Sequence, residues 1–318
     1  MSVEYPLVSV LVPVYKQQDL ISETVESILA QNYPSIEILI SDDASPDSSA
    51  NVINGLAARY PTVRSFAQEK NLGITANYNF LASKAIGKYI AIFSGDDLMM
   101  PGKIAAQVDA LEQNPDSSFC HHAVYDMAPS GKIRGIIDHF YEDGVTTIKD
   151  VLNNLGIPGS MTILYRASSS PQPPFEPSIP TASDWLNMID LCARGRGIYL
   201  DTPFVCYRRD DSYNGKDPTR YEGDFIKTLE LALHRYAYSH PEIGAACDFA
   251  LARFYLGAGY RRLYLGHVKI AREYFLLAAT QKSLKPKAMA LWLISYFPVR
   301  PSLLLRMKKI YKKMVSAA

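Results

Sequence analysis

Two apolar stretches of this chain each end in carboxylates, and this feature limits the folds open to it. The stretch 36–43 ends at Asp43, and the stretch 88–97 ends at Asp96 and Asp97. Continuous apolar runs of this length between helical patterns predict strands buried on both faces, as in a parallel sheet. Ligands of open α/β sheets bind beyond the carboxyl ends of such strands. The sequence therefore predicts an α/β fold with a polar-ligand site at this edge, and a cluster of oxygen ligands favours a hard cation such as Mg2+ or Mn2+.

Helix capping is the alternative explanation for an acidic residue that follows a strand. Asp42 or Asp47 could do no more than cap the next helix. For a single aspartate the two explanations are equally good. Two acidic sites within one alternating array favour the functional one.

The first half of the chain alternates between strand and helix patterns. Expected strands are residues 8–15, 36–43, 63–66 and 88–97, and expected helices are one ending near residue 31, then 48–60, 77–86 and 103–113. This order predicts a mostly parallel sheet with right-handed crossovers. Residues 118–125 and 159–166 are candidates for added antiparallel strands. A helix is expected over 185–193, and a last strand, interrupted by Pro203, over 198–208.

The pattern becomes helical after the sheet region. We expect a sheet domain over residues 1–215 and a helical region over 216–318, with helices at 225–239, 247–265 and 268–281. The spacing of Ala250, Tyr255, Ala271 and Ala278 looks like one tetratricopeptide-type hairpin. Because one such unit cannot build a solenoid, it is interpreted as a packing appendage.

Charge is unevenly distributed along the chain, although the formal net charge is only +1. Residues 282–318 hold nine of the 33 basic residues and no acidic one, which leaves 24 basic against 32 acidic residues elsewhere. The acidic body argues against nucleic-acid binding, and the basic tail indicates one anionic partner surface. In the tail, apolar residues recur at helical spacing among the basic ones: Leu303, Leu304, Met307, Tyr311 and Met314. We expect a basic amphipathic helix lying on an anionic membrane; the alternative is that its apolar face packs on the hairpin.

The four cysteines are scattered, without Cys-x-x-Cys spacing. A zinc site or disulfide framework is therefore not expected, and the pattern favours reduced thiols in a cytoplasmic protein. No stretch offers the roughly 18 uncharged apolar residues that a membrane-spanning helix needs. Any membrane association is expected to be peripheral, at the inner face of the cell membrane.

Four motifs appear in a characteristic order: Val8–Tyr15, the Asp42–Ser45 turn, Asn71-x-Gly73, and Ser94–Asp97 followed by Pro101. Together they resemble family 2 glycosyltransferases of the inverting GT-A fold, over roughly residues 5–215. The resemblance implies transfer of a sugar from a UDP- or dTDP-sugar to a hydroxyl of a glycan or lipid-linked acceptor. It also implies a role in synthesis of a bacterial surface polysaccharide such as an O-antigen, capsule or exopolysaccharide.

The resemblance also implies roles for individual residues. Pro13, Val14 and Tyr15 are placed against the nucleotide base and ribose, and Asp43 matches the carboxylate that accepts from the pyrimidine N3–H. Asp96 matches a residue near the ribose. Asp97 matches the ligand of a metal, Mg2+ or Mn2+, that would neutralise charge on the departing diphosphate.

Asp184 is the candidate general base implied by the resemblance. It follows a segment, 168–180, with five prolines and precedes an amphipathic helix. Inversion by single displacement needs a carboxylate that accepts the acceptor hydroxyl's proton. The alternative is that Asp184 only caps the helix.

The sequence departs from the family pattern at four positions. Ser94 and Ser183 stand where acidic residues are usual, Tyr78 where an arginine is usual, and Asp210 where a histidine is common. These departures bear on metal affinity and donor choice, not on the fold. His121 and His122 are interpreted as structural and receive no role.

Two other functions are considered. The first is a non-catalytic module of the same fold that binds a nucleotide-sugar or glycan; the aspartates at 43, 97 and 184 argue against it, and Ser94 argues weakly for it. The second is a nucleotidyltransferase, which should carry a glycine-rich phosphate loop, whereas residues 13–18 contain no glycine.

Overall fold

A computed structural model describes residues 5–139, 141–209 and 221–297. The chain divides into two compact units, residues 1–151 with 156–216, and residues 152–155 with 217–318. The junction near residue 215, the basic tail over 303–314 and Asp210 lie outside the described residues.

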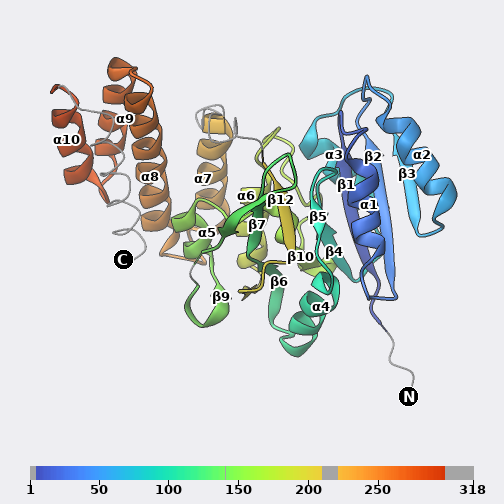
Figure 1. Ribbon diagram of the computed structural model, residues 1–318. Coiled ribbons are helices and arrows are strands. Elements are labelled where there is room, and N and C mark those ends of the chain that lie inside the picture. The colour runs from blue at the N-terminus through green and yellow to red at the C-terminus, as the bar shows by residue number, and fades with distance from the viewer. Residues whose placement is uncertain (1–4, 140, 210–220, 298–318) are drawn as a thin grey trace. The chain divides into compact units, whose positions relative to one another are not determined.

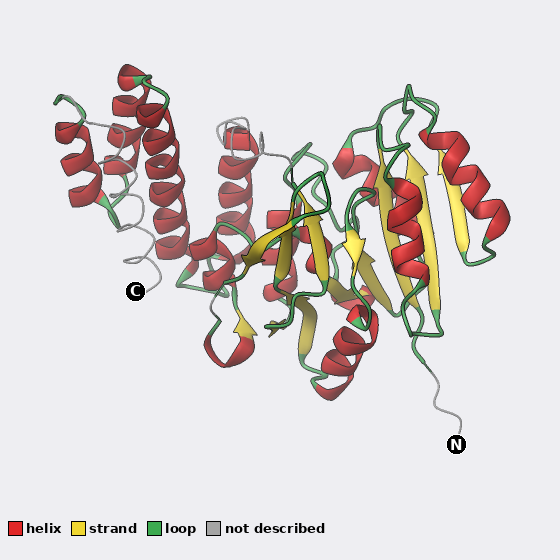
Figure 2. Ribbon diagram, in the orientation of Figure 1, coloured by secondary structure: helices red, strands yellow, loops and turns green. Residues whose placement is uncertain are grey.

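The first unit is built on an eight-stranded sheet (Figures 1 and 2). Its strands, in spatial order, are β3 (Val63–Ala67), β2 (Ile36–Asp42), β1 (Val8–Val14), β4 (Tyr89–Ile92), β10 (Leu164–Arg166), β6 (Ser117–His122), β11 (Arg196–Leu200) and β9 (Val145–Thr146). β1 pairs in parallel with both β2 and β4, and β2 pairs in parallel with β3. This arrangement confirms the predicted mostly parallel sheet.

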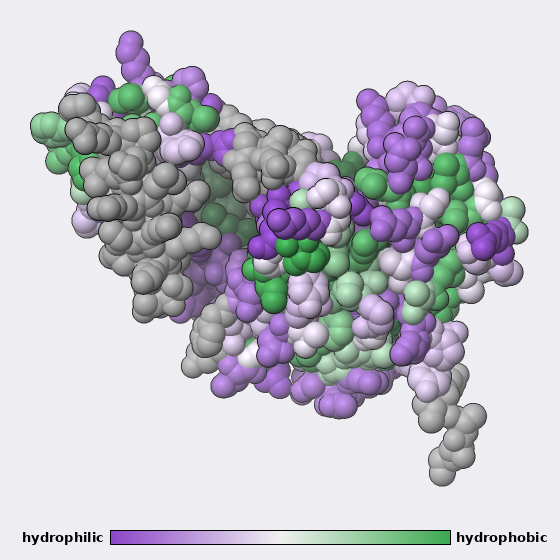
Figure 3. Space-filling view, in the orientation of Figure 1, coloured by the Kyte–Doolittle hydropathy of each residue, from purple (hydrophilic) through white to green (hydrophobic). Residues whose placement is uncertain are grey.

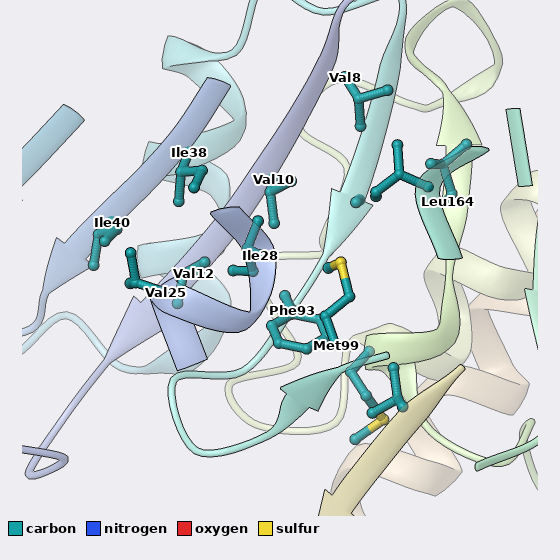
Figure 4. Packing of buried hydrophobic residues seen from close by; sticks show 14 of the residues in the cluster. Val8, Val10, Val12, Val25, Ile28, Ile38, Ile40, Phe93, Met99 and Leu164 are labelled. Atoms are coloured by element: carbon teal, nitrogen blue, oxygen red, sulfur yellow. The ribbon is translucent and has the colours of Figure 1, made fainter. Parts of the chain in front are cut away.

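The core of this sheet follows from the apolar runs that predicted it. All seven residues of β1 are buried. From the helix α1 (Ile21–Leu29), Val25 and Ile28 point toward the branched side chains of β1 and β2, among them Val12 and Ile40 (Figure 4). Each fully buried side chain of this kind stabilises the fold by about 1.5–3 kcal/mol. This packing fixes the strand ends on which the acidic residues sit.

Four further helices belong to the first unit: α2 (Ser49–Arg59), α3 (Ile74–Lys84), α4 (Lys103–Gln113) and α6 (Asp184–Cys192). The residues of a shorter helix, α5 (Ile148–Asn154), are divided between the two units after Val151. On the face seen in Figure 3, hydrophilic residues spread over the edges with hydrophobic ones scattered among them, as is usual for a surface in water.

A second, four-stranded sheet was not anticipated. Its order is β5 (Leu98–Met99), β12 (Val205–Arg208), β7 (Val124–Met127) and β8 (Ile133–Ile137). The expected strand 118–125 is divided between β6 and β7 at Ala123, and the expected strand 198–208 is divided between β11 and β12. In both places the chain leaves one sheet and enters the other.

The directions of the added strands were partly wrong in the sequence analysis. β10 is antiparallel to both neighbours, as expected. β6 is antiparallel to β10 and therefore runs parallel to β4. The reason is that α4 forms a helical crossover between β4 and β6, and such a connection returns the chain in the same direction.

The second unit contains α7 (Glu222–Tyr236), α8 (Ile243–Tyr264), α9 (Val268–Thr280) and α10 (Lys285–Ile294). Between α8 and α9, Gly266 has φ +80°, a conformation that favours glycine. Gly259 permits close packing, since a Cβ there would lie 2.5 Å from the Phe275 ring. The separate helix α10 was not foreseen. In the described ranges, no helix combines the length and hydropathy needed to cross a bilayer.

Candidate active site

A cavity of about 350 Å³ lies at the carboxyl ends of β1, β2 and β4. It is lined by five residues to which the resemblance gives a role: Pro13, Val14, Tyr15, Asp43 and Asp96. The turn 71–74, the first part of α3 and the pair Ser94–Gly95 complete the wall. The three strand ends meet here because their strands are adjacent and parallel.

Asp43 shapes one wall of this cavity. Its Oδ1 accepts a hydrogen bond from the Leu72 N–H at 2.7 Å, and its Oδ2 accepts one from the Gly73 N–H at 3.0 Å. The Asn71 Nδ2 donates to the Asp43 carbonyl oxygen at 3.1 Å. Gly73 has φ +83°, which favours glycine at this turn. Asp43 therefore organises the 71–73 turn, and each of its carboxylate oxygens retains a second acceptor site for a ligand.

Asp96 and Asp97 occupy different environments. Asp96 is partly exposed and lines the cavity, whereas Asp97 is fully buried and does not line it. The Arg208 N–H donates to Asp97 Oδ1 at 2.8 Å, and the Arg208 Nε–H donates to the Asp96 carbonyl oxygen at 2.9 Å. Burial, and then the charge of Asp96, raises the pKa of Asp97 well above its usual value. An ionised Asp97 is therefore costly unless a positive charge joins it.

The acidic pair fits part of a cation site. Asp97 Oδ2 is buried without a hydrogen-bond partner in the described structure, and the adjacent Asp96 supplies a second carboxylate. Among the described residues, no three His, Cys, Asp or Glu side chains come together as a metal site. A hard cation held here would take its other ligands from substrate phosphate and water, as Mg2+ commonly does.

Asp184 is the first residue of α6 and is partly exposed. Desolvation raises its pKa to about 6, against a smaller opposing effect of the backbone N–H groups of Trp185 and Asp184 itself. A carboxylate with this pKa is ionised at neutral pH and is basic enough to accept a proton.

Tyr78 links Asp184 to the cavity. It is a buried part of the cavity wall, and its hydroxyl donates to the Phe93 carbonyl oxygen at 2.9 Å. Burial raises the pKa of Tyr78 well above its usual value, with further contributions from the charges of Asp184, Asp97 and Asp96 in that order. The structure therefore places all three carboxylates within electrostatic range of one cavity residue, although Asp184 and Asp97 do not line the cavity.

Sequence reasoning missed two polar residues of the cavity wall, Gln17 and Asn77. A Cβ on Gly95 would lie 2.4 Å from Gln17 Oε1, so the glycine leaves room for this amide. The Asn77 Nδ2 donates to the Ser41 carbonyl oxygen at 3.2 Å, while its buried Oδ1 has no partner in the described structure. A polar residue four positions after the turn glycine, in the first turn of the following helix, was the available signal for Asn77.

His121 and His122 are core residues. His121 Nε2 lies 2.6 Å from Thr146 Oγ1, and His122 Nδ1 lies 2.7 Å from the Ala123 carbonyl oxygen. Burial lowers the pKa of His121 to about 3 and that of His122 well below its usual value. Both rings are neutral at physiological pH.

A comparison with protein families matches residues 9–168, half of the chain, to the model described as Glycosyl transferase family 2. The uncharacterized protein Rv1520 of Mycobacterium tuberculosis is 37% identical over 114 residues, which cover 35% of this chain and 33% of that protein. EpsE of Bacillus subtilis, named as a glycosyltransferase, is 32% identical over 52% of this chain and 58% of its own length. TuaG of the same organism, named as a glycosyltransferase of teichuronic acid biosynthesis, is 29% identical over 61% of this chain and 75% of its own. The match thus spans about a third of the mycobacterial relative.

Solved structures share the fold. TarS 1–349 of S. aureus in complex with UDP superposes with a TM-score of 0.62 at 17% identity, over 91% of this chain and 89% of that one. The mannosyltransferase PcManGT of Pyrobaculum calidifontis, in complex with GDP-Man and Mn2+, gives a TM-score of 0.58 at 17% identity, over 99% of this chain and 85% of that one. Identities this low establish a common fold and nothing further.

Proposed function

The chain belongs to glycosyl transferase family 2, and from this premise we propose that it transfers a sugar from a UDP- or dTDP-sugar to a hydroxyl of a glycan or lipid-linked acceptor. The observation that carries the proposal is the cavity at the strand ends, which joins Pro13, Val14 and Tyr15 to Asp43 and Asp96. The names of EpsE and TuaG support a place in bacterial polysaccharide synthesis.

The proposed reaction is a single displacement with inversion. Asp184 accepts the proton of the acceptor hydroxyl as that oxygen attacks the anomeric carbon, and the nucleoside diphosphate leaves. The raised pKa of Asp184, about 6, supports this role. Asp97 and Asp96 would hold Mg2+ or Mn2+, which when bound supplies neutralisation of the diphosphate charge.

Asp43 is proposed to select the base. A carboxylate oxygen fixed by the 71–73 turn can accept from the N3–H of uracil or thymine, and it repels the N3 lone pair of cytosine. Pro13 and Tyr15 would contact the base and ribose, and Asp96 would lie near the ribose or the cation.

A panel of nucleotides tests this assignment. UDP and dTDP with Mn2+ are expected to raise the Tm by several degrees, since a ligand at about 100 times its Kd stabilises a protein by about 2.7 kcal/mol. CDP is expected to give a much smaller shift, and UDP- or dTDP-sugars to be slowly hydrolysed. A shift with GDP alone would contradict pyrimidine selection, and donor binding without hydrolysis or transfer would favour the non-catalytic module that Ser94 leaves open.

Attachment to the inner face of the cell membrane is also proposed, on the basis of the uneven charge. The basic residues of the tail would each contribute about 1 kcal/mol near anionic lipid. Reversing Lys308, Lys309, Lys312 and Lys313 to glutamate in the full chain is expected to weaken co-sedimentation with anionic liposomes by roughly 10³-fold. The matched control reverses four exposed lysines outside the tail, Lys70, Lys84, Lys132 and Lys149. Equal binding of both variants would show that the tail does not reach the membrane.

A further inference from the structure

The candidate base Asp184 follows a proline-rich segment that is held in position by hydrogen bonds from neighbouring elements. Residues 168–180 hold five prolines and form no long helix or strand. Because proline has no backbone N–H, this segment cannot be fixed by a continuous series of backbone hydrogen bonds of its own. Its contacts to neighbouring elements therefore decide where α6, and with it Asp184, begins.

Asn79 of α3 makes a two-point contact with this segment. The Phe175 N–H donates to Asn79 Oδ1 at 3.0 Å, and the Asn79 Nδ2 donates to the Phe175 carbonyl oxygen at 2.7 Å. The amide thus satisfies both backbone groups of Phe175, which fixes that residue in distance and in orientation. The Phe175 ring is buried and stacks on Tyr78 with centroids 5.0 Å apart.

The same segment is tied to α6 directly. The Asn187 Nδ2 donates to the Pro174 carbonyl oxygen at 2.9 Å, and Asn187 lies in the same helix as Asp184, three positions further on. A shift of Phe175 would move its neighbour Pro174 and be transmitted to α6 through this bond. A second tie lies closer to Asp184, where the Thr75 hydroxyl donates to the Ile179 carbonyl oxygen at 2.8 Å.

Helix α3 also forms part of the cavity wall. Ile74, Asn77 and Tyr78 line the cavity, while Thr75, Tyr78 and Asn79 hold the proline-rich segment. Helix α3 therefore contacts both the cavity, where the donor is proposed to bind, and the proline-rich segment that precedes Asp184. An error of about 1 Å in such a distance can cost about 10²-fold in rate.

We propose that Asn79 is a positioning residue of this enzyme, which sets Asp184 against the donor cavity by clamping the backbone of Phe175. This inference rests on the proposed role of Asp184 as general base. Asn79 itself does not line the cavity and touches no substrate in this assignment.

A double-mutant cycle tests the proposal in the full-length protein. Asn79→Ala is expected to lower transfer by about 10- to 100-fold while the Kd for UDP with Mn2+ changes less than about twofold. In an Asp184→Asn background the same substitution is expected to cause little further loss, because residues that act through one group are not additive. Asn114→Ala, which removes a helix-end side-chain bond elsewhere, is the matched control and should leave transfer unchanged.

The outcomes separate this inference from the proposed function. If Asp184→Asn lowers transfer by about 10²-fold or more and Asn79→Ala does not lower it, or lowers the residual rate equally in both backgrounds, positioning by Asn79 is refuted and the base assignment stands. If Asp184→Asn itself retains transfer, the base assignment fails. Asn79→Asp is the second variant in case Asn79→Ala does not fold; it keeps an acceptor for the Phe175 N–H but loses the donor to the Phe175 carbonyl oxygen. A loss of transfer of less than about twofold there would likewise refute the proposal.

Discussion

Replacing Asp184 with asparagine is expected to remove turnover and to leave the donor affinity nearly intact. The amide keeps the shape of the carboxylate at the first position of α6, but it cannot accept a proton from the acceptor hydroxyl. General-base catalysis contributes typically 10²–10⁴-fold, so a loss in this range is expected. Transfer rates and the Kd of UDP, measured on the same preparations, check the prediction.

The pH dependence provides a second check on Asp184. Its folded-state pKa is raised to about 6 from an ordinary value of 3.8. As a base it must be ionised, so kcat/KM is expected to fall as the pH drops through about 6, and Asp184→Asn should lose this limb.

The free energy of unfolding should change with pH in the opposite direction to kcat/KM. Between pH 3.8 and about 6 the folded protein holds a proton that the unfolded chain has lost. Stability from this group therefore falls as the pH rises through that window. Asp184→Asn lacks this titrating group, so its free energy of unfolding should rise relative to that of the wild type as the pH rises through the same interval.

A control distinguishes catalysis from helix capping. Asp150 also lies in the first turn of a helix, where its Oδ2 accepts from the Thr147 N–H and hydroxyl. Asp150→Asn keeps an acceptor oxygen and loses the favourable charge at the helix N-terminus, so it should cost about 0.3–1 kcal/mol and leave turnover unchanged. If donor binding and stability fall together with turnover in Asp184→Asn, the residue has a folding role instead.

Replacing Asp97 with asparagine is expected to lower transfer by at least about 10²-fold, because the diphosphate would lose several kcal/mol of charge stabilisation. The stabilisation of the protein by UDP with Mn2+ should be lost as well. The same substitution is not expected to lower the Tm without metal. It preserves an oxygen acceptor for the Arg208 N–H and removes a buried charge beside Asp96.

Isothermal titration with Mn2+ and UDP, a melting curve without metal and a transfer assay test this prediction. Asp109→Asn, on the exposed side of α4, is the matched control. An unshifted metal requirement with more than about a tenth of the turnover would contradict the assignment of Asp97. A fall in Tm in proportion to activity would indicate that the carboxylate is structural.

The parallel part of the sheet could be predicted because its information is local. Val8–Val14 and Ile36–Asp42 are continuous apolar runs, and such runs are stable only where both faces are covered. Carboxylates that follow two such runs lie at one edge if the strands are parallel and close together in the sheet, and β2 and β4 both pair in parallel with β1. Asp43 and Asp96 do line one cavity for this reason.

The division between the two sheets could not be predicted in this way. Residues 118–125 read as one strand, yet they are divided between β6 and β7, which belong to different sheets. A local sequence pattern predicts that a residue lies in a strand, but it does not predict which sheet that strand joins. That choice depends on pairing partners such as β11 and β12, about 80 residues away along the chain.

By itself, the sequence determined the strand runs, the acidic residues at their ends and the basic character of the tail, because apolar periodicity and charge are properties of neighbouring residues. Only the tertiary structure decided that Asp96 faces the cavity while Asp97 is buried against Arg208, and that Asn79 holds Phe175 and so the approach to Asp184. These contacts join residues 111 and 96 positions apart. They exist because the crossovers of the sheet bring distant segments to one edge, and no local pattern records which segments will meet there.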